Sequence, residues 1–248
     1  MMKLMQHALL AFALVAALPT QAAVALDRTR VIYTGDSKSQ SLNIRNHNKE
    51  LPYLAQAWME DAMGRKISSP FVVLPPVQRL EPGADSMLKV QATQASHLLP
   101  QDRESLFYFN LREIPPRSDK PNSLQLALQT RIKFFYRPQS LVVEPEAHVA
   151  PWQQQLKLTP AQGHYRVENP TPYFITLVDA ASKADDEGQA DFTPLMLAPF
   201  GQGELNLGVA RLGNTPTLTY VDDFGGRRPL HFRCTDQHCS LTSADKAA

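Results

Sequence analysis

The chain has little that predicts helix. After residue 22, apolar residues rarely recur at the three- and four-residue intervals of an amphipathic helix, and short apolar or alternating runs are separated by Pro, Gly, Asn and Asp. No segment after residue 22 approaches the roughly 18 consecutive apolar residues of a membrane-spanning helix. These absences predict an all-β fold without direct membrane insertion.

The chain also lacks an excess of charge. It has 25 Lys and Arg against 24 Asp and Glu, and Lys3 is the only charged residue among the first 22. A balanced charge argues against a general nucleic-acid or anionic-membrane binder, since both need a basic surface.

Motifs of catalysis are missing. There is no G-x-S-x-G elbow, H-E-x-x-H, P-loop or G-x-G-x-x-G. Gly35-Asp36-Ser37 resembles the start of a GDSL-type esterase motif, but Lys38 follows where Leu is expected, and these residues favour a polar turn. We predict no enzyme and no cofactor. The enzyme alternative is a secreted β-rich hydrolase that uses Ser37.

Cysteine is scarce, with only Cys234 and Cys239. His231 and His238 stand beside them, so a zinc site is one reading, but C-x4-C exceeds the usual knuckle spacing and no second ligand pair exists. In an exported protein we predict a disulfide across a terminal hairpin, contributing about 2 kcal/mol, and no metal.

The first 22 residues have the features of a secretory signal. Lys3 precedes an apolar run from Ala8 to Leu18, and Thr20-Gln21-Ala22 offers small residues for cleavage. We therefore predict a signal peptide over residues 1–22 and a mature chain starting near Ala23. The alternative is an uncleaved anchor.

The remaining residues, about 226 in number, suit two domains of about 100 residues each. Strands are predicted over 24–33, 40–46, 51–59, 71–80, 86–92, 105–114 and 123–138, then over 152–158, 163–169, 172–180, 192–198, 203–208, 217–223, 229–234 and 239–243. Pro75-Pro76 and Pro115-Pro116 are expected to end strands, and one helical turn is expected within 93–105. The pattern is typical of two β-sandwiches.

The run from Ser123 to Pro138 is expected to form one strand about twice the usual length. Leu124, Leu126 and Leu128 alternate with more polar residues. Either the leucines fill the domain's own core, or the strand presents an open edge that is lent to a partner.

Several blocks resemble the periplasmic pilus (fimbrial) chaperones: "LDRTR", "LPYLAQAW", "PPVQRLEPG", "LPQDRESLFYFNLREIPPR", "IKFFYRP" and "ENPTPY". The resemblance implies two immunoglobulin-like β-sandwich domains, over residues 23–140 and 141–248, in an angled, boomerang-like arrangement. It implies a chaperone that caps pilus subunits by donating a strand and delivers them to an outer-membrane usher. The short loop "IPPRSDKPNS" points to rod-like adhesive pili. The alternative is a pilin or adhesin subunit of similar fold.

The resemblance also assigns roles to residues. Arg30 and Lys133 would hold the subunit's C-terminal carboxylate, and Leu124, Leu126 and Leu128 would fill its groove. An ionic network near the domain junction would consist of Glu104, Arg137 and Asp223. Arg131 rivals Lys133, because alternation places both on one strand face, opposite the leucines. The open edge makes self-capping by a second copy plausible.

Overall fold

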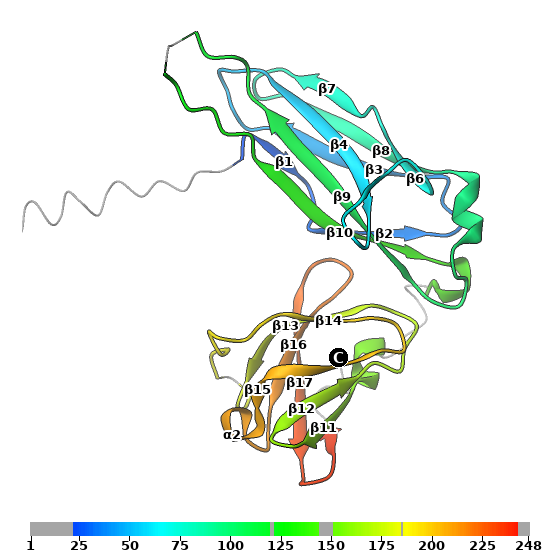
Figure 1. The fold of residues 1–248 in the computed structure, drawn as a ribbon, viewed down its shortest axis with the longest axis vertical. Coiled ribbons are helices and arrows are strands. Elements are labelled where there is room, and N and C mark those ends of the chain that lie inside the picture. Colours follow the sequence, from blue (N-terminus) through cyan, green and yellow to red (C-terminus); the bar gives the residue numbers. More distant parts are fainter. Residues whose placement is uncertain (1–21, 120–121, 144–150, 185, 243–248) are drawn as a thin grey trace, which may run out of the picture.

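A computed structural model describes residues 22–119, 122–143, 151–184 and 186–242. The predicted signal peptide therefore lies outside the described residues, except for Ala22. The described chain forms two β-sandwich lobes set at an angle to one another (Figure 1). Within this part of the chain, no helix is long and apolar enough to cross a membrane.

The N-terminal lobe contains two sheets. The first has the strand order β1-β3-β8-β6, and the second has the order β2-β10-β9-β4-β5, with β7 also on β4. Their bounds are β1 Val24–Leu26, β2 Arg30–Thr34, β3 Ser39–Asn46, β4 Tyr53–Asp61, β5 Lys66–Ile67, β6 Phe71–Leu74, β7 Val77–Leu80, β8 Asp85–Ala92, β9 Ser105–Ile114 and β10 Gln129–Arg137. A 3-10 helix over Gln94–Leu98 confirms the predicted helical turn.

Two runs that the sequence analysis took as single strands are each divided between the sheets. The run 24–33 becomes β1, which pairs with β3, and β2, which pairs in parallel with β10. The run 71–80 becomes β6 and β7, and Pro75-Pro76 separates them as expected, since proline cannot donate to a ladder. At each division, the chain passes from one sheet of the sandwich to the other.

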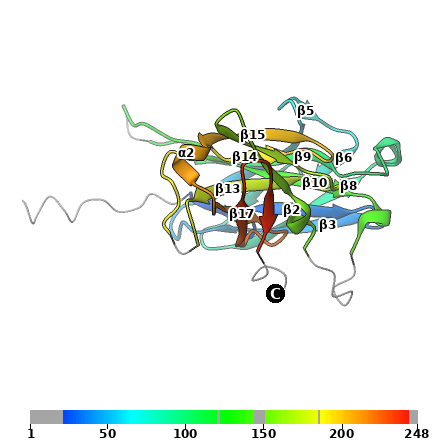
Figure 2. The same ribbon diagram turned by 90° about the horizontal axis from the view of Figure 1, so that it is seen from below.

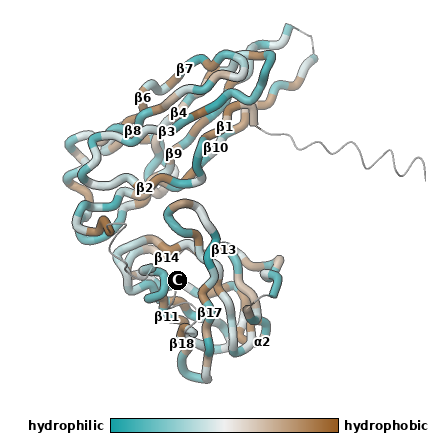
Figure 3. Tube along the Cα trace, turned by 180° about the vertical axis from the view of Figure 1, so that it is seen from behind, coloured by the Kyte–Doolittle hydropathy of each residue, from teal (hydrophilic) through white to brown (hydrophobic). Residues whose placement is uncertain are grey.

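Aromatic rings fill much of the N-terminal core. Phe71 is fully buried and contacts Tyr33, Phe107 and Phe134 at centroid distances of 5.0, 5.2 and 4.9 Å. Figure 3 shows apolar positions distributed along the strands of both lobes. The alternation predicted for these strands places one row of side chains inward, which is why each sheet has one apolar face.

The C-terminal lobe repeats this plan with its own core. Its sheets have the orders β11-β12-β15 and β14-β13-β16-β17-β18. A separate cluster of buried residues fills the space within the lobe. The helix α2 (Val209–Leu212) follows β15 directly (Figure 2). The strand bounds are β11 Lys157–Ala161, β12 His164–Glu168, β13 Ile175–Ala181, β14 Leu195–Leu197, β15 Gln202–Gly208, β16 Thr217–Val221, β17 Arg227–Cys234 and β18 Cys239–Leu241.

The predicted disulfide joins Cys234 to Cys239, which are register partners on β17 and β18. The sequence-based domain limits, 23–140 and 141–248, stay a prediction, because residues 144–150 between the lobes are not described.

The prediction of one strand from Ser123 to Pro138 is wrong in its first half. The strand β10 begins at Gln129, and its partner β9 ends at Ile114. Pro115 and Pro116 follow, and neither has the N–H group that would continue the ladder opposite the leucines. The last backbone bond of this pairing runs from Glu113 N–H to the Leu128 carbonyl at 3.0 Å.

The three leucines consequently stand outside the sheet. Leu124, Leu126 and Leu128 are 86%, 65% and 43% exposed. They therefore do not fill the core of their own domain, which was one of the two readings of this segment.

We predict that Leu126→Ser leaves the free chain's unfolding free energy within about 0.5 kcal/mol of wild type, because an exposed side chain contributes little to the core. Leu88→Ala, at a fully buried position, is the matched comparison and should cost about 2–5 kcal/mol. Urea denaturation of both variants measures this. A large loss for Leu126→Ser would place that leucine in the core after all.

Candidate functional site: two free cations at the domain junction

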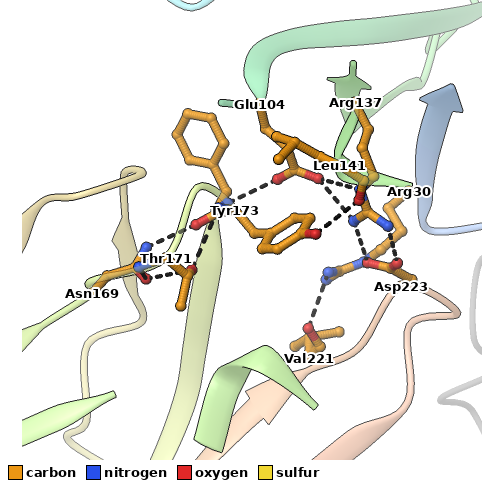
Figure 4. A network of polar contacts seen from close by, with 10 residues as sticks. Arg30, Glu104, Arg137, Leu141, Asn169, Thr171, Tyr173, Val221 and Asp223 are labelled. Carbon is orange, nitrogen blue, oxygen red and sulfur yellow. Dashed lines mark hydrogen bonds and ion pairs between the residues drawn. The ribbon is translucent and has the colours of Figure 1, made fainter. Parts of the chain in front are cut away.

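Arg137, the last residue of β10, connects the two lobes. Its Nε donates to Glu104 Oε1 at 2.8 Å, and its Nη1 and Nη2 donate to the two carboxylate oxygens of Asp223 at 2.7 and 3.1 Å (Figure 4). Glu104 belongs to the N-terminal lobe and Asp223 to the β16–β17 turn of the C-terminal lobe. The three residues that the resemblance grouped are thus brought together, and the paired geometry is the strong form of an arginine–carboxylate contact.

Glu104 reaches the C-terminal lobe through its own backbone and side chain. Its Oε2 accepts from the Phe174 N–H at 2.8 Å, and its N–H donates to the Pro172 carbonyl at 2.9 Å. The carboxylate therefore links Arg137 to the segment just before β13. Its role at the junction does not depend on the ion pair alone.

Aromatic rings surround the guanidinium of Arg137. Its Cζ lies 4.9 Å from the ring centre of Trp152 and 5.0 Å from that of Tyr173, and the two rings stack at 4.3 Å. The Tyr173 hydroxyl donates to the Leu141 carbonyl at 2.7 Å. These rings exclude water from the cation and add cation–π attraction. The sequence analysis missed Trp152 and did not assign a role to Tyr173, although Tyr173 ends the quoted "ENPTPY" block.

The Asn169–Thr171 turn holds this aromatic platform. The Asn169 amide donates to the Tyr173 carbonyl at 2.7 Å, and its oxygen accepts from the Thr171 hydroxyl at 2.7 Å (Figure 4). The same amide donates to the Ala198 carbonyl at 2.9 Å. Asn169 is fully buried. Its amide group satisfies two backbone carbonyls that lie outside the strands.

Burial and charge act in opposite directions within the network. Burial raises the pKa of Glu104, and the nearby Arg137 charge opposes this rise. Burial also disfavours the charged form of Arg137, but hydrogen bonds to Asp223 and the field of Glu104 leave its pKa raised. The guanidinium is therefore charged at any physiological pH, and removing either carboxylate would leave it partly uncompensated.

We predict that Glu104→Ala destabilises the chain by about 3–5 kcal/mol, because it leaves a buried cation without one partner. Thermal or urea unfolding measures the loss, and small-angle scattering measures any change in the angle between the lobes. Asp85→Asn, in an exposed ion pair with Arg45 at 3.4 Å, is the control and should change little. Wild-type stability and lobe angle in Glu104→Ala would contradict the role of this network.

Arg30 and Lys133 lie beside the network on neighbouring strands. Arg30 begins β2, Lys133 lies in β10, and their Cα positions are register partners in the parallel pairing. Arg30 Nη1 donates to the Val221 carbonyl at 3.3 Å, and Lys133 Nζ donates to the Thr176 hydroxyl at 2.9 Å. Both cations therefore face the C-terminal lobe. The sequence analysis did not predict that Val221 and Thr176 would be the partners of these cations.

Neither cation forms a salt bridge with a carboxylate among the described residues. The Arg30 Nε is also buried without a hydrogen-bond partner in that part of the chain. Burial lowers the pKa of Arg30, against the attraction of Asp223, Asp222 and Glu104. Burial and the neighbouring Arg30 charge lower the pKa of Lys133 to about 8. The pair thus has the charge and the open donors to hold an anion.

The structure separates Lys133 from its rival. Arg131 pairs with Glu60 at 2.8 Å and lies 3.4 Å from the ring centre of Tyr108. The Arg131 charge is therefore already compensated by Glu60. Lys133 lies two residues nearer the junction, where Arg30 is.

We predict that Lys133 titrates near pH 8 in the free chain, and that Arg30→Met raises this pKa by removing a like charge. Because the folded pKa is below the unfolded value, the unfolded chain binds more protons above pH 8, so stability should rise between about pH 8 and 10.5. Heteronuclear NMR of the lysine side chain measures the titration. An ordinary lysine pKa, unchanged in Arg30→Met, would show that the site is solvated.

An open strand edge lies next to the cations. On the side of β10 away from β9, β2 pairs only with Lys133–Arg137. Residues 129–132 of β10 therefore face no strand on that side within the described chain. A hollow of about 420 Å³ borders this edge, lined by residues that include Leu26, Thr130 and Ile132. Before Gln129 the chain contains the exposed leucines. They occupy even-numbered positions, whereas Lys133 occupies an odd-numbered one.

The residues of the two alternatives, a zinc site at the cysteines and a hydrolase that uses Ser37, make other contacts in the described part of the chain. Cys234 and Cys239 are bonded to one another, and the described residues contain no cluster of three metal-ligating side chains. The Ser37 hydroxyl lies 2.8 Å from the Thr34 hydroxyl in a turn. In the described part of the chain, the two cysteines are thus bonded to one another, and the hydroxyl partner of Ser37 is Thr34.

Sequence models of one family match both lobes. The "Pili and flagellar-assembly chaperone, PapD N-terminal domain" matches residues 23–142, and the "Pili assembly chaperone PapD, C-terminal domain" matches residues 151–232. The chain belongs to this family of pilus-assembly chaperones. The resemblance and the fold class predicted from the sequence are confirmed.

Individual relatives agree with the family. The chaperone protein PapD of Escherichia coli is 50% identical over 221 residues, which cover 89% of this chain and 90% of PapD. The probable fimbrial chaperone YfcS of Escherichia coli K12 is 46% identical over 220 residues, covering 89% and 86%. Relatives are thus named as chaperones, which favours that class over a structural pilus subunit.

Solved structures have the same two-lobed fold. The periplasmic chaperone SfaE is 31% identical with a TM-score of 0.66, over 84% of this chain and 98% of SfaE. A chain from the Salmonella enterica complex of the SafA pilin with the SafB chaperone is 26% identical with a TM-score of 0.70, over 88% and 99%.

Proposed function

We propose that the mature chain is a periplasmic chaperone that binds, folds and caps pilus subunits by donor-strand complementation and passes them to an outer-membrane usher. Its two domains would span residues 23–140 and 141–248, after removal of residues 1–22. It would act without nucleotide, metal or catalysis. Family membership supports the class, and the site supports the mechanism.

The observation that carries the mechanism is the pair of cations that has no carboxylate partner in the described part of the chain. Arg30 and Lys133 lie side by side in a partly buried position, and burial disfavours the charged form of both side chains. An incoming carboxylate would relieve this cost, and arginine can engage it with two parallel hydrogen bonds. The free C-terminus of a pilus subunit is such a group. Its binding there would place the subunit's last strand along the open edge of β10.

The exposed leucines would then supply what the subunit lacks. Leu124, Leu126 and Leu128 extend from the start of β10 with the alternation of a strand. Burying each in a subunit groove would contribute about 1.5–3 kcal/mol, and the cost of association and ordering would offset much of this gain. The segment would gain its strand partners from the subunit, because its own domain offers none past Ile114.

Anchor and leucines together would fix the register of the complex. Moving the subunit by one residue would turn every side chain of its paired strand to the wrong face. An ion pair at one end prevents this slip. Lys133 lies on the row of β10 that alternates with Ile132 and Phe134, so the anchor and the groove-filling row do not compete for space.

The solved complex of the SafA pilin with the SafB chaperone supports pilus subunits as partners of this chain. A structural subunit would instead carry a polymerising extension before its first strand, whereas β1 starts at Val24, directly after the predicted cleavage site. A second copy of the chain could also pair with the open edge when no subunit is present.

We predict that the wild-type chain co-purifies from the periplasm in a one-to-one complex with a pilin subunit of its own operon. Arg30→Ala and Lys133→Ala should fold but lose the complex, because each removes one half of the carboxylate anchor. Gel filtration of the co-expressed pair measures this. Arg131→Ala is the matched control and should retain the pilin, because Arg131 is paired with Glu60.

A peptide from the pilin's C-terminal strand separates charge from strand pairing. The free acid should bind the wild-type chain at least tenfold more tightly than the C-terminal amide, and this ratio should fall toward one in Lys133→Ala. Equal binding of acid and amide would exclude a carboxylate anchor. Failure of wild type to retain any pilin would exclude the chaperone mechanism itself.

A further inference from the structure

One buried acid has no part in the proposed mechanism. Glu113 occupies the core-facing row of β9 with Phe107, Phe109 and Leu111, and it is 5% exposed. A carboxylate in such a row is costly unless a cation or several donors stabilise it. Strand alternation alone would put an apolar residue there.

Glu113 is hydrogen-bonded to the start of the folded chain. Its Oε2 accepts from the Val24 N–H at 2.7 Å. On the other side of the same peptide unit, the Ala23 carbonyl accepts from the His47 N–H at 2.6 Å. The Ala23–Val24 peptide is thus held from both sides, before β1 has begun to pair along its length.

No cation of the described chain pairs with Glu113. Arg28 and His47 line the adjacent hollow, but the Arg28 guanidinium is paired with Asp27 at 2.8 Å. Among the described residues, the Val24 N–H is the one hydrogen-bond donor to this carboxylate, in a place where buried charges are normally paired.

We infer that Glu113 is the binding site for the α-ammonium group that cleavage after Ala22 creates on Ala23. Successive backbone nitrogens lie within about 3.7 Å of each other, so the Ala23 nitrogen must lie close to the carboxylate that already holds Val24. In the uncleaved chain this nitrogen is a neutral amide. Cleavage makes it a cation and frees it to rotate toward Glu113.

The ion pair would form only after processing, and it would strengthen the link that the Val24 hydrogen bond already makes between β1 and β9. β1 belongs to one sheet of the N-terminal lobe and β9 to the other, so the bond would close the sandwich at this end. The chain leads from β1 directly into Arg30 at the start of β2. The inference rests on the signal-peptide cleavage within the proposed function, but on neither subunit binding nor the anchor.

The test uses the free mature chain without any pilin. Intact mass of the periplasmic protein should show a first residue of Ala23. Nα-acetylation of that residue, which removes the charge and leaves the Val24 N–H in place, should lower Tm by about 5 °C. Glu113→Gln keeps an acceptor for Val24 but no charge, so acetylation should have no effect in that variant.

Two further measurements keep the test decisive. A chain that retains Gln21-Ala22 should behave like the acetylated one, because its amine is displaced. The Ala23 amine in wild type should titrate above the usual range of about 7.7–8.0; Arg28 and His47, the other titratable groups beside it, would only lower that value. Glu187→Gln, at an exposed acid, is the control and should leave the acetylation effect intact.

Three results would overturn the inference. They are a mature chain that starts elsewhere than Ala23, a Tm that acetylation does not change, and an equal loss on acetylation in Glu113→Gln. If Glu113→Gln does not fold, the amine titration in wild type decides, and an ordinary amine pKa counts against the ion pair. Because no subunit is involved, a failed pilin capture leaves each of these outcomes unchanged.

Discussion

The arrangement of the molecule depends on one buried guanidinium. Arg137 ends β10 and bonds both to Glu104 in its own lobe and to Asp223 in the other. The strand that Arg137 fixes at the junction also contains Lys133, four residues earlier. Rigid placement of the lobes therefore also sets where Thr176 and Val221 meet Lys133 and Arg30.

The junction contains two kinds of cation with opposite electrostatic environments. Arg137 has two carboxylates and two stacked rings, which compensate for its burial. Among the described residues, Arg30 and Lys133 have only neutral hydrogen-bond partners, and burial lowers the pKa of both. The Arg30 charge lowers the pKa of Lys133 further, whereas nearby carboxylates oppose the shift at Arg30. In the proposed mechanism, this pair would favour anion binding, because the two like charges are already close together in the free protein. The ion pairs of Arg137 fix the end of β10 at the junction, and β10 holds Lys133 beside Arg30.

Sequence reasoning reached the fold class because strand alternation and proline breaks are local signals. It failed at Ser123–Leu128, where strand formation depends on whether a neighbour can donate hydrogen bonds, and Pro115 and Pro116 in the neighbour cannot. It favoured Lys133 over Arg131 only through the resemblance of "IKFFYRP" to the family, because the contact that distinguishes them is made by Glu60, which is 71 residues from Arg131 in the chain. Thr176, Trp152 and Glu113 were missed for the same reason, since their partners come from distant strands.

The exposed leucine segment has a physical consequence for the free chain. An apolar segment beside an open strand edge is a site for unwanted pairing, which most proteins avoid by covering or charging such edges. Here Arg30 and Lys133 place positive charge at one end of the edge. A subunit with a free carboxylate would bring the opposite charge to these cations. In the proposed mechanism, the anchor would favour a subunit over a second copy of the chain through its attraction for the subunit's carboxylate.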